Sequence, residues 1–189
     1  KLFQQIDEAA SKFRINMGFT RDSTQILEKN VRAAYFELAQ MGVVAENLYQ
    51  AFQDISGVIG TSQAATIGMA KDMALMSVSL GVTEGVSAKF ALSMGMMAGA
   101  TMDSQKNIAL FTSKLSEAAG TNLKEVMSDV AAATSAAYKF MIRSPIALAK
   151  AAVEAKKLGT SLSSAAKSAE SLITFGKSVE LEMAASVLL

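Results

Sequence analysis

The chain has 189 residues, with 18 Lys and Arg against 17 Asp and Glu, and a formal net charge of +1. It contains no Cys and no His, one Pro, 12 Met and 33 Ala. Without Cys or His there is no disulfide, no thiolate or His-ligated zinc site, and no His-paired nucleophile. A near-neutral chain also lacks the basic surface of a nucleic-acid binder. We therefore predict that it is not an enzyme, needs no cofactor or metal and binds no specific nucleic acid.

The composition predicts an all-α fold, because Ala is abundant and Pro is rare. The apolar residues are mostly small ones or Met, which suits close helix packing against copies of the chain or inside a larger assembly. The alternative is a monomeric Ala-rich bundle. The uncharged stretch at residues 90–102 falls short of the ~20 residues of a membrane span. The chain starts at Lys1 and stops in mid-pattern at Leu189, so we interpret it as a segment of a longer protein.

Residues 1–41 are predicted to form N-terminal helices that precede the rest of the pattern. The first runs from about residue 3 to 16 and carries apolar residues at helical spacing, namely Phe3, Ile6, Ala10 and Phe13. The second is capped by Asp22, Ser23 or Thr24 and extends to about Gln40. Within it, Glu28 and Arg32 stand at i and i+4 and are expected to pair.

Four glycines are spaced by 39 residues: Gly42, Gly81, Gly120 and Gly159. Each follows an apolar residue and precedes Val or Thr, and a polar capping residue comes next in three of the four, namely Thr83, Asn122 and Ser161. A glycine in the left-handed conformation just past a helix, followed by a capping residue, marks a helix stop and a helix start. The spacing therefore predicts a structural repeat.

A second break falls about halfway through each period, at Gly60-Thr61-Ser62, Asp103-Ser104 and Ser144-Pro145. Pro145 suits the first position of a helix that Ser144 caps. Each period then contains two helices, and a period near 40 residues is typical of helical-hairpin arrays. We predict αα-hairpins over residues 42–80, 81–119, 120–158 and, incompletely, 159–189.

The predicted helices are amphipathic. One packing face consists of Met69, Met73, Met76 and Leu80. In a later helix, Ile146, Ala149 and Val153 are expected to form the buried face. Small residues spaced four apart predict a strip for close helix crossing, at Ala91, Gly95 and Gly99.

Candidate chemistry is sparse. The acidic pairs Asp7-Glu8 and Glu180-Glu182 stand at neighbouring or i, i+2 positions, where helical side chains diverge, so we interpret them as solvated charges. The run Gly176-Lys177-Ser178 ends like a phosphate loop but has Ser171 where the first glycine belongs. Lysines at 156, 157, 167 and 177 give only a weak basic bias.

The C-terminal third resembles the tape measure proteins of bacteriophage tails. The residues concerned are 147–162 (ALAKAAVEAKKLGTSL), 165–175 (AAKSAESLITF) and 178–189 (SVELEMAASVLL). In that family a helix ending in Ala-Lys-Lys-Leu-Gly precedes a Leu-Leu-x-Phe-Glu-x-Ser-Ile-Glu-x-Glu-like core and an Ala-Ser-Val-Leu-Leu ending. Residues 118–130 (AAGTNLKEVMSDV) are similar to the preceding repeat. The resemblance extends from about Gly120 to Leu189, is weak before Gly42, and departs from the pattern at Thr174 and Gly176.

The resemblance implies a structural protein of the virion, held in the lumen of the tail tube near the hub. Such a protein sets tail length and takes part in assembly and genome ejection. The implied partners are copies of the chain, as a trimer or hexamer, together with tail tube and baseplate hub proteins, and the host membrane during ejection. One alternative is a membrane-active helical translocator that forms a channel for DNA delivery. A cell-wall hydrolase domain is a further alternative, disfavoured by the lack of His and of a convergent carboxylate pair.

Overall fold

The computed structural model describes residues 2–60, 66–99, 101–139 and 144–172 of the chain. Over these residues the structure is helical and contains no strand, which confirms the predicted all-α class. The helices are α1 (Leu2–Met17), α2 (Arg21–Leu38), η1 (Ala39–Met41), α3 (Ala45–Ile59), α4 (Ile67–Leu80), α5 (Glu84–Ala98), α6 (Met102–Ala119), α7 (Leu123–Lys139) and α8 (Pro145–Lys157). A further helix covers residues 162–172.

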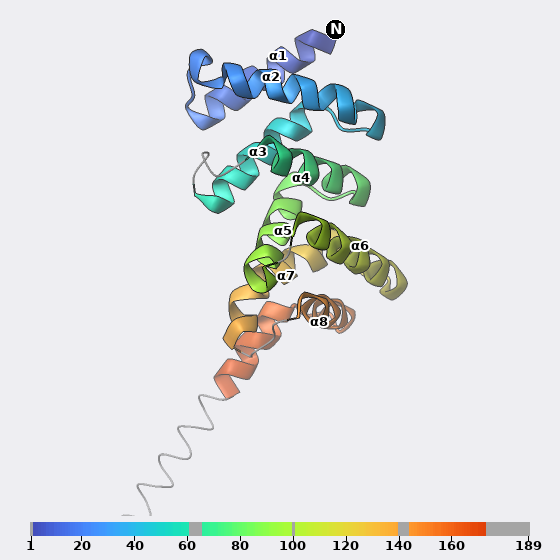
Figure 1. Cartoon of the computed structure of the whole chain (residues 1–189). Helices are drawn as coiled ribbons and strands as arrows, with labels where there is room; N and C mark the ends of the chain where they lie inside the picture. The colour runs from blue at the N-terminus through green and yellow to red at the C-terminus, as the bar shows by residue number, and fades with distance from the viewer. Residues whose placement is uncertain (1, 61–65, 100, 140–143, 173–189) are drawn as a thin grey trace, which may run out of the picture.

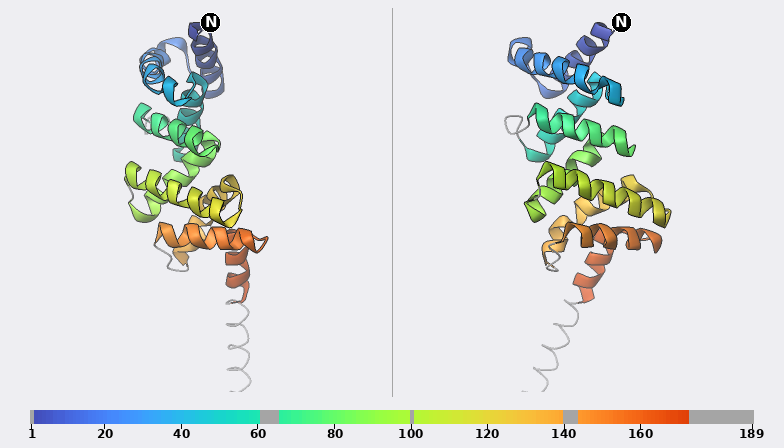
Figure 2. Two further views of the ribbon diagram at one scale, coloured as in Figure 1. Left: turned by 90° about the vertical axis from the view of Figure 1, so that its right-hand side faces the viewer. Right: turned by 45° about the vertical axis from the view of Figure 1, so that its right-hand side comes forward.

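The helices stack in two layers. One layer runs through α1, α3, α5 and α7, and the other through α2, α4, α6 and α8, with each helix contacting the next member of its own layer. Helices that follow each other in the chain join the layers, as α3 and α4 do. Figures 1 and 2 show an elongated stack with the N-terminus at one end and α8 and the 162–172 helix at the other.

The same turn follows η1, α4, α6 and α8. Gly42, Gly81, Gly120 and Gly159 all have φ between 64° and 82°, in the left-handed region. The residue after each glycine donates its N–H to a carbonyl five residues back, which is the Schellman pattern. These bonds are Val43 to Leu38 (3.4 Å), Val82 to Ser77 (3.0 Å), Thr121 to Ser116 (2.9 Å) and Thr160 to Ala155 (3.0 Å). Gly18, which sequence reasoning overlooked, makes the same turn between α1 and α2.

Polar side chains cap several helix starts. The Asn122 side chain accepts the Glu125 N–H at 3.2 Å, whereas Thr83 precedes α5 without a side-chain hydrogen bond. Ser144 caps α8 by accepting the Ala147 N–H at 3.3 Å, and Pro145 occupies the first helical position.

Three predicted helix starts are displaced. The helix expected to start from a cap at Asp22, Ser23 or Thr24 begins before these residues, at Arg21. The helix expected after Gly60 begins only at Ile67, with Thr66 as its cap, and residues 61–65 lie outside the described residues. The helix expected from Asp103 begins one residue earlier, at Met102, because Thr101 caps it. Both cap hydroxyls accept an N–H three residues on, so a Thr outweighs the nearby glycine or acid as a start signal.

The core runs the length of the stack. Its large members come from several helices and include Ile6, Leu48, Ile55, Met73, Phe90, Met94, Met127 and Leu148. Between them lie fully buried alanines, among them Ala70, Ala88, Ala109 and Ala152. A small side chain at a helix crossing lets the backbones approach closely, and this is how an Ala-rich chain fills its interior.

Three packing expectations were wrong. Ile146 is 47% exposed, because the buried stripe of α8 is shifted to include Leu148 alongside Ala149 and Val153. Gly99 does not continue a small-residue strip, since it ends α5 with a φ of 58°. Glu28 and Arg32 do not pair with each other, because α1 packs alongside and supplies partners for both.

Candidate functional site

The structure brings together no catalytic or metal-binding constellation among the residues it describes. No group of three or more Asp, Glu, His or Cys side chains there could hold a metal ion. Asp7 pairs with Arg32 of α2 at 2.6 Å, and both Asp7 and Glu8 are exposed to solvent. The other acidic pair, Glu180-Glu182, and the run Gly176-Lys177-Ser178 lie outside the described residues.

The predicted packing face on α4 points into the stack. Met73 and Met76 are buried, and Met69 and Leu80 are partly buried against the core. Because α4 contacts α2, α3, α5 and α6, these side chains fill a junction between both layers. Met suits such an irregular space, since its unbranched side chain adapts to several neighbours.

The turn glycines are required by the backbone rather than by lack of space. A Cβ added at Gly81, Gly120 or Gly159 would meet no heavy atom within 4 Å, and at Gly42 it would meet only Val78 Cγ1, at 3.4 Å. The left-handed conformation disfavours side chains whatever room surrounds them. These glycines therefore fix where η1, α4, α6 and α8 end.

Ion pairs connect successive helices in the layer that contains α2, α4, α6 and α8. Lys71 of α4 pairs with Glu37 of α2, and Asp72 of α4 pairs with Lys106 of α6 at 2.5 Å. The two members of each pair are 34 residues apart in the chain, so the spacing of residues within one helix could not have identified these pairs. Partly exposed ion pairs near the surface of this kind stabilise a protein weakly.

A polar cluster lies where α1, α2 and α3 meet. Arg14 pairs with Glu28, which also accepts the Thr24 hydroxyl at 3.0 Å. The Tyr49 hydroxyl is buried and has no hydrogen-bond partner among the described residues. Burial, followed by the charge of Glu28, raises the pKa of Tyr49 well above its ordinary value. The phenol therefore stays neutral. Its ring packs against that of Phe13, with the ring centroids 5.2 Å apart and the ring planes inclined by 34°.

The surface depressions carry little chemistry. An open hollow of 780 Å³ at α3 and α5 includes Asp54, Lys89 and Gly85 in its lining. Burial is the main influence on Asp54 and raises the pKa of its carboxyl, against a hydrogen bond from Gln50 at 2.9 Å. A smaller hollow of 160 Å³ between α4 and α6 is mostly apolar. The Ser56 hydroxyl, at the first hollow, donates to the Phe52 carbonyl at 2.8 Å.

Sequence reasoning predicted a helix start at Ser161, and the 162–172 helix does begin there, but a second contributor to this start was missed. The Ser161 hydroxyl accepts the Ser164 N–H at 3.0 Å. Asp129 of α7, which is only 6% exposed, accepts the two preceding N–H groups, of Leu162 and Ser163. The sequence shows Asp129 only as an acid on a predicted helix, and this does not reveal that its partners are the N–H groups of Leu162 and Ser163.

Over the described residues the fold is an all-helical, two-layered stack with a left-handed glycine after η1, α4, α6 and α8. Within the described residues, no helix is both long enough and apolar enough to cross a bilayer. Comparison of the chain with protein-family models, curated proteins and solved structures finds no match.

Proposed function

We propose that this chain is a structural segment of a bacteriophage tail tape measure protein. The observation that carries the proposal is the pattern from Gly120 to Leu189. In it, a helix ending in Ala-Lys-Lys-Leu-Gly leads into the next helix and an Ala-Ser-Val-Leu-Leu ending. The helix boundary supports the comparison, because α8 ends at Lys157 and Gly159 takes the left-handed conformation.

The proposed architecture is an array of αα-hairpins with a period of 39 residues. Recurring chemistry supports it: the Schellman turn occurs at four glycines with that spacing. The helices that follow three of these glycines, α3, α5 and α7, start at residues 45, 84 and 123. In such arrays each hairpin buries its apolar face against its neighbours, and length is added one unit at a time.

The chain is proposed to act in the tail lumen as a trimer or hexamer, matching a six-fold tube. Its partners are tail tube and baseplate hub proteins, and the host membrane during ejection. Large apolar side chains remain in water on a single copy, including Ile26 (78% exposed), Leu158 (81%) and Leu172 (70%). Contacts with other copies or with the tube would cover them, in keeping with an assembly component.

The test is to delete residues 82–120 in frame from the phage gene and measure tail lengths by electron microscopy. This deletion joins Gly81 to Thr121, so the Gly-Thr turn is kept. A fully extended helix of that length spans about 58 Å. If the segment belongs to the ruler, we expect tails shortened by about 58 Å or less.

The matched control is Gly81→Val, which strains a turn but keeps the number of residues. It should weaken folding and leave tail length unchanged. If the deletion gives tails of normal length but blocks assembly or infection, the segment is a folded anchor rather than a ruler. Normal tails with normal infectivity would contradict a role in the tail.

A further inference from the structure

The 162–172 helix is attached to the stack differently from α1–α8. None of its residues is buried, and the ones that turn toward the protein are mostly small: Leu162, Ser163, Ala166 and Ala169. Leu162 alone among them packs against the core, while Leu172, the last residue that the structure describes, is 70% exposed. In Figures 1 and 2 this helix extends from the end of the stack instead of lying across it. Apolar burial therefore contributes little to holding it.

What holds its first turn is a carboxylate from another helix. Asp129 of α7 accepts the Leu162 N–H at 2.5 Å and the Ser163 N–H at 3.2 Å, one with each oxygen. Ser161 accepts the Ser164 N–H with its hydroxyl, and its carbonyl accepts the Ala165 N–H in the first ordinary helical bond. The N–H groups of Leu162, Ser163 and Ser164, which have no partner within the helix, are thus satisfied. Two of these three are satisfied across the helix interface.

This arrangement is electrostatically favourable but confined to one point. Asp129 carries a negative charge at the positive end of the 162–172 helix dipole, and hydrogen bonds to a charged acceptor are about twice as strong as neutral ones. The carboxylate borders a hollow of 500 Å³ that is lined otherwise by polar residues, among them Asn122 and Lys156. Water therefore reaches the neighbourhood of the bonds and can replace them once they open.

We propose that the 162–172 helix is a detachable arm, latched to the stack by the Asp129 carboxylate. With the latch closed the arm stands at a fixed angle to α7 and α8. With it open the arm swings while α3–α8 stay folded. The inference rests on these contacts and is independent of the function proposed above.

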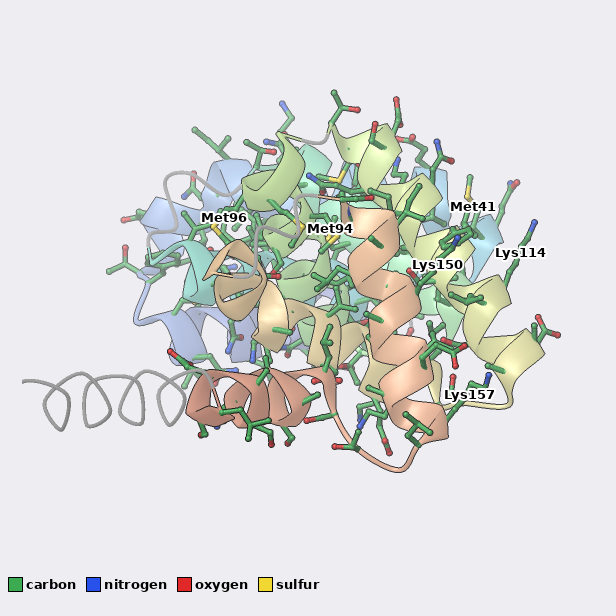
Figure 3. The ribbon with its side chains drawn as sticks, turned by 90° about the horizontal axis from the view of Figure 1, so that it is seen from below. Met41, Met94, Met96, Lys114, Lys150 and Lys157 are labelled. Atoms are coloured by element: carbon green, nitrogen blue, oxygen red, sulfur yellow. The ribbon has the colours of Figure 1, made fainter. Side chains whose placement is uncertain are left out.

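The test combines Asp129→Asn with a distance measurement. Cysteines at Lys150 on α8 (labelled in Figure 3) and Ser168 on the arm carry spin labels, and the chain has no native Cys to interfere. An asparagine keeps the shape but offers only one acceptor atom. We expect a broadened, longer interspin distance, and amide hydrogen exchange at residues 162–166 that is about tenfold faster or more.

Two control variants separate a latch from simpler roles. Ser161→Ala removes the arm's own cap, so it should fray the first turn and leave the interspin distance unchanged. Glu125→Gln removes an exposed ion pair to Lys156, 3.2 Å long, from the same helix as Asp129, and it should change neither readout.

Three outcomes would overturn the proposal. The first is an Asp129→Asn variant with unchanged distance and exchange. The second is an equal distance change in Ser161→Ala, which would make the carboxylate merely a cap. The third is loss of exchange protection across α3–α6 in Asp129→Asn, which would make Asp129 a support of the whole core.

Discussion

At the scale of single residues, the backbone conformation of the turn glycines decides more than their surroundings. Gly120 has a φ of 64° and open space where a side chain would project. Gly57 has similar open space but lies within α3 at an ordinary helical φ. The two positions are alike in exposure and differ in conformation, so they make a matched pair.

Substitution by alanine should therefore have opposite effects at the two sites. Gly120→Ala should lower the free energy of unfolding by about 1–2 kcal/mol, the cost of the left-handed conformation for a residue with a Cβ. Gly57→Ala should raise it by about 0.5–1 kcal/mol, because alanine loses less backbone entropy in a helix. Denaturant unfolding of both variants measures this, and a loss of equal size at both sites would contradict it.

At the scale of elements, local chemistry explains what could be predicted from the sequence. Gly42, Gly81, Gly120 and Gly159 were predictable as helix ends because a Schellman turn uses only residues within one turn of the glycine. The all-α class followed from composition in the same way.

Features that depend on a neighbouring helix were beyond the sequence. Ile146 has the spacing of a buried residue, yet the position of α6 and α7 against α8 decides which stripe is covered. Glu28 finds Arg14 on α1 instead of its helical neighbour Arg32. The partners of Asp129 are 33 and 34 residues away. A single sequence does not show which residues of different helices lie opposite each other, so such pairs could not be predicted from it.

The packing face of α4 gives a prediction at this scale. Met73 lies where the two layers meet and is 1% exposed, whereas Met41 in η1, labelled in Figure 3, is 54% exposed. Met73→Ala should reduce the free energy of unfolding by about 2–5 kcal/mol, through lost burial and the cavity left behind.

Met41→Ala serves as the control and should change stability by less than about 0.5 kcal/mol. Thermal or denaturant unfolding compares them. Similar small losses in both variants would show that α4 does not form the junction between the layers.

At the scale of the whole molecule, the extensive contacts among α1–α8 join helices that are at most three apart in chain order. The layers run α1, α3, α5, α7 and α2, α4, α6, α8 with no extensive contact between α1 and α5, or between α2 and α6. Stability in such a stack is the sum of local terms and interfaces between adjacent units. A core mutation should therefore weaken the protein near its own site.

Leu148 of α8 and Leu48 of α3 test this point, since both are fully buried and far apart in the stack. Leu148→Ala should speed amide hydrogen exchange in α7 and α8 and leave α1 protected. Leu48→Ala should do the reverse, with α1 and α3 exchanging faster than α8. Mass spectrometry of both variants gives the answer, and uniform acceleration in either one would indicate a single cooperative unit.

The stacking of neighbours also has a mechanical consequence. A pull applied along the stack loads the contacts between successive helices of each layer in series, so we expect the weakest contact to yield first while the others stay closed. Each helix pair that opens would release a length of chain and relax the tension before the next one gives way. No disulfide limits the extension, because the chain contains no Cys. We therefore expect the molecule to lengthen in steps under load.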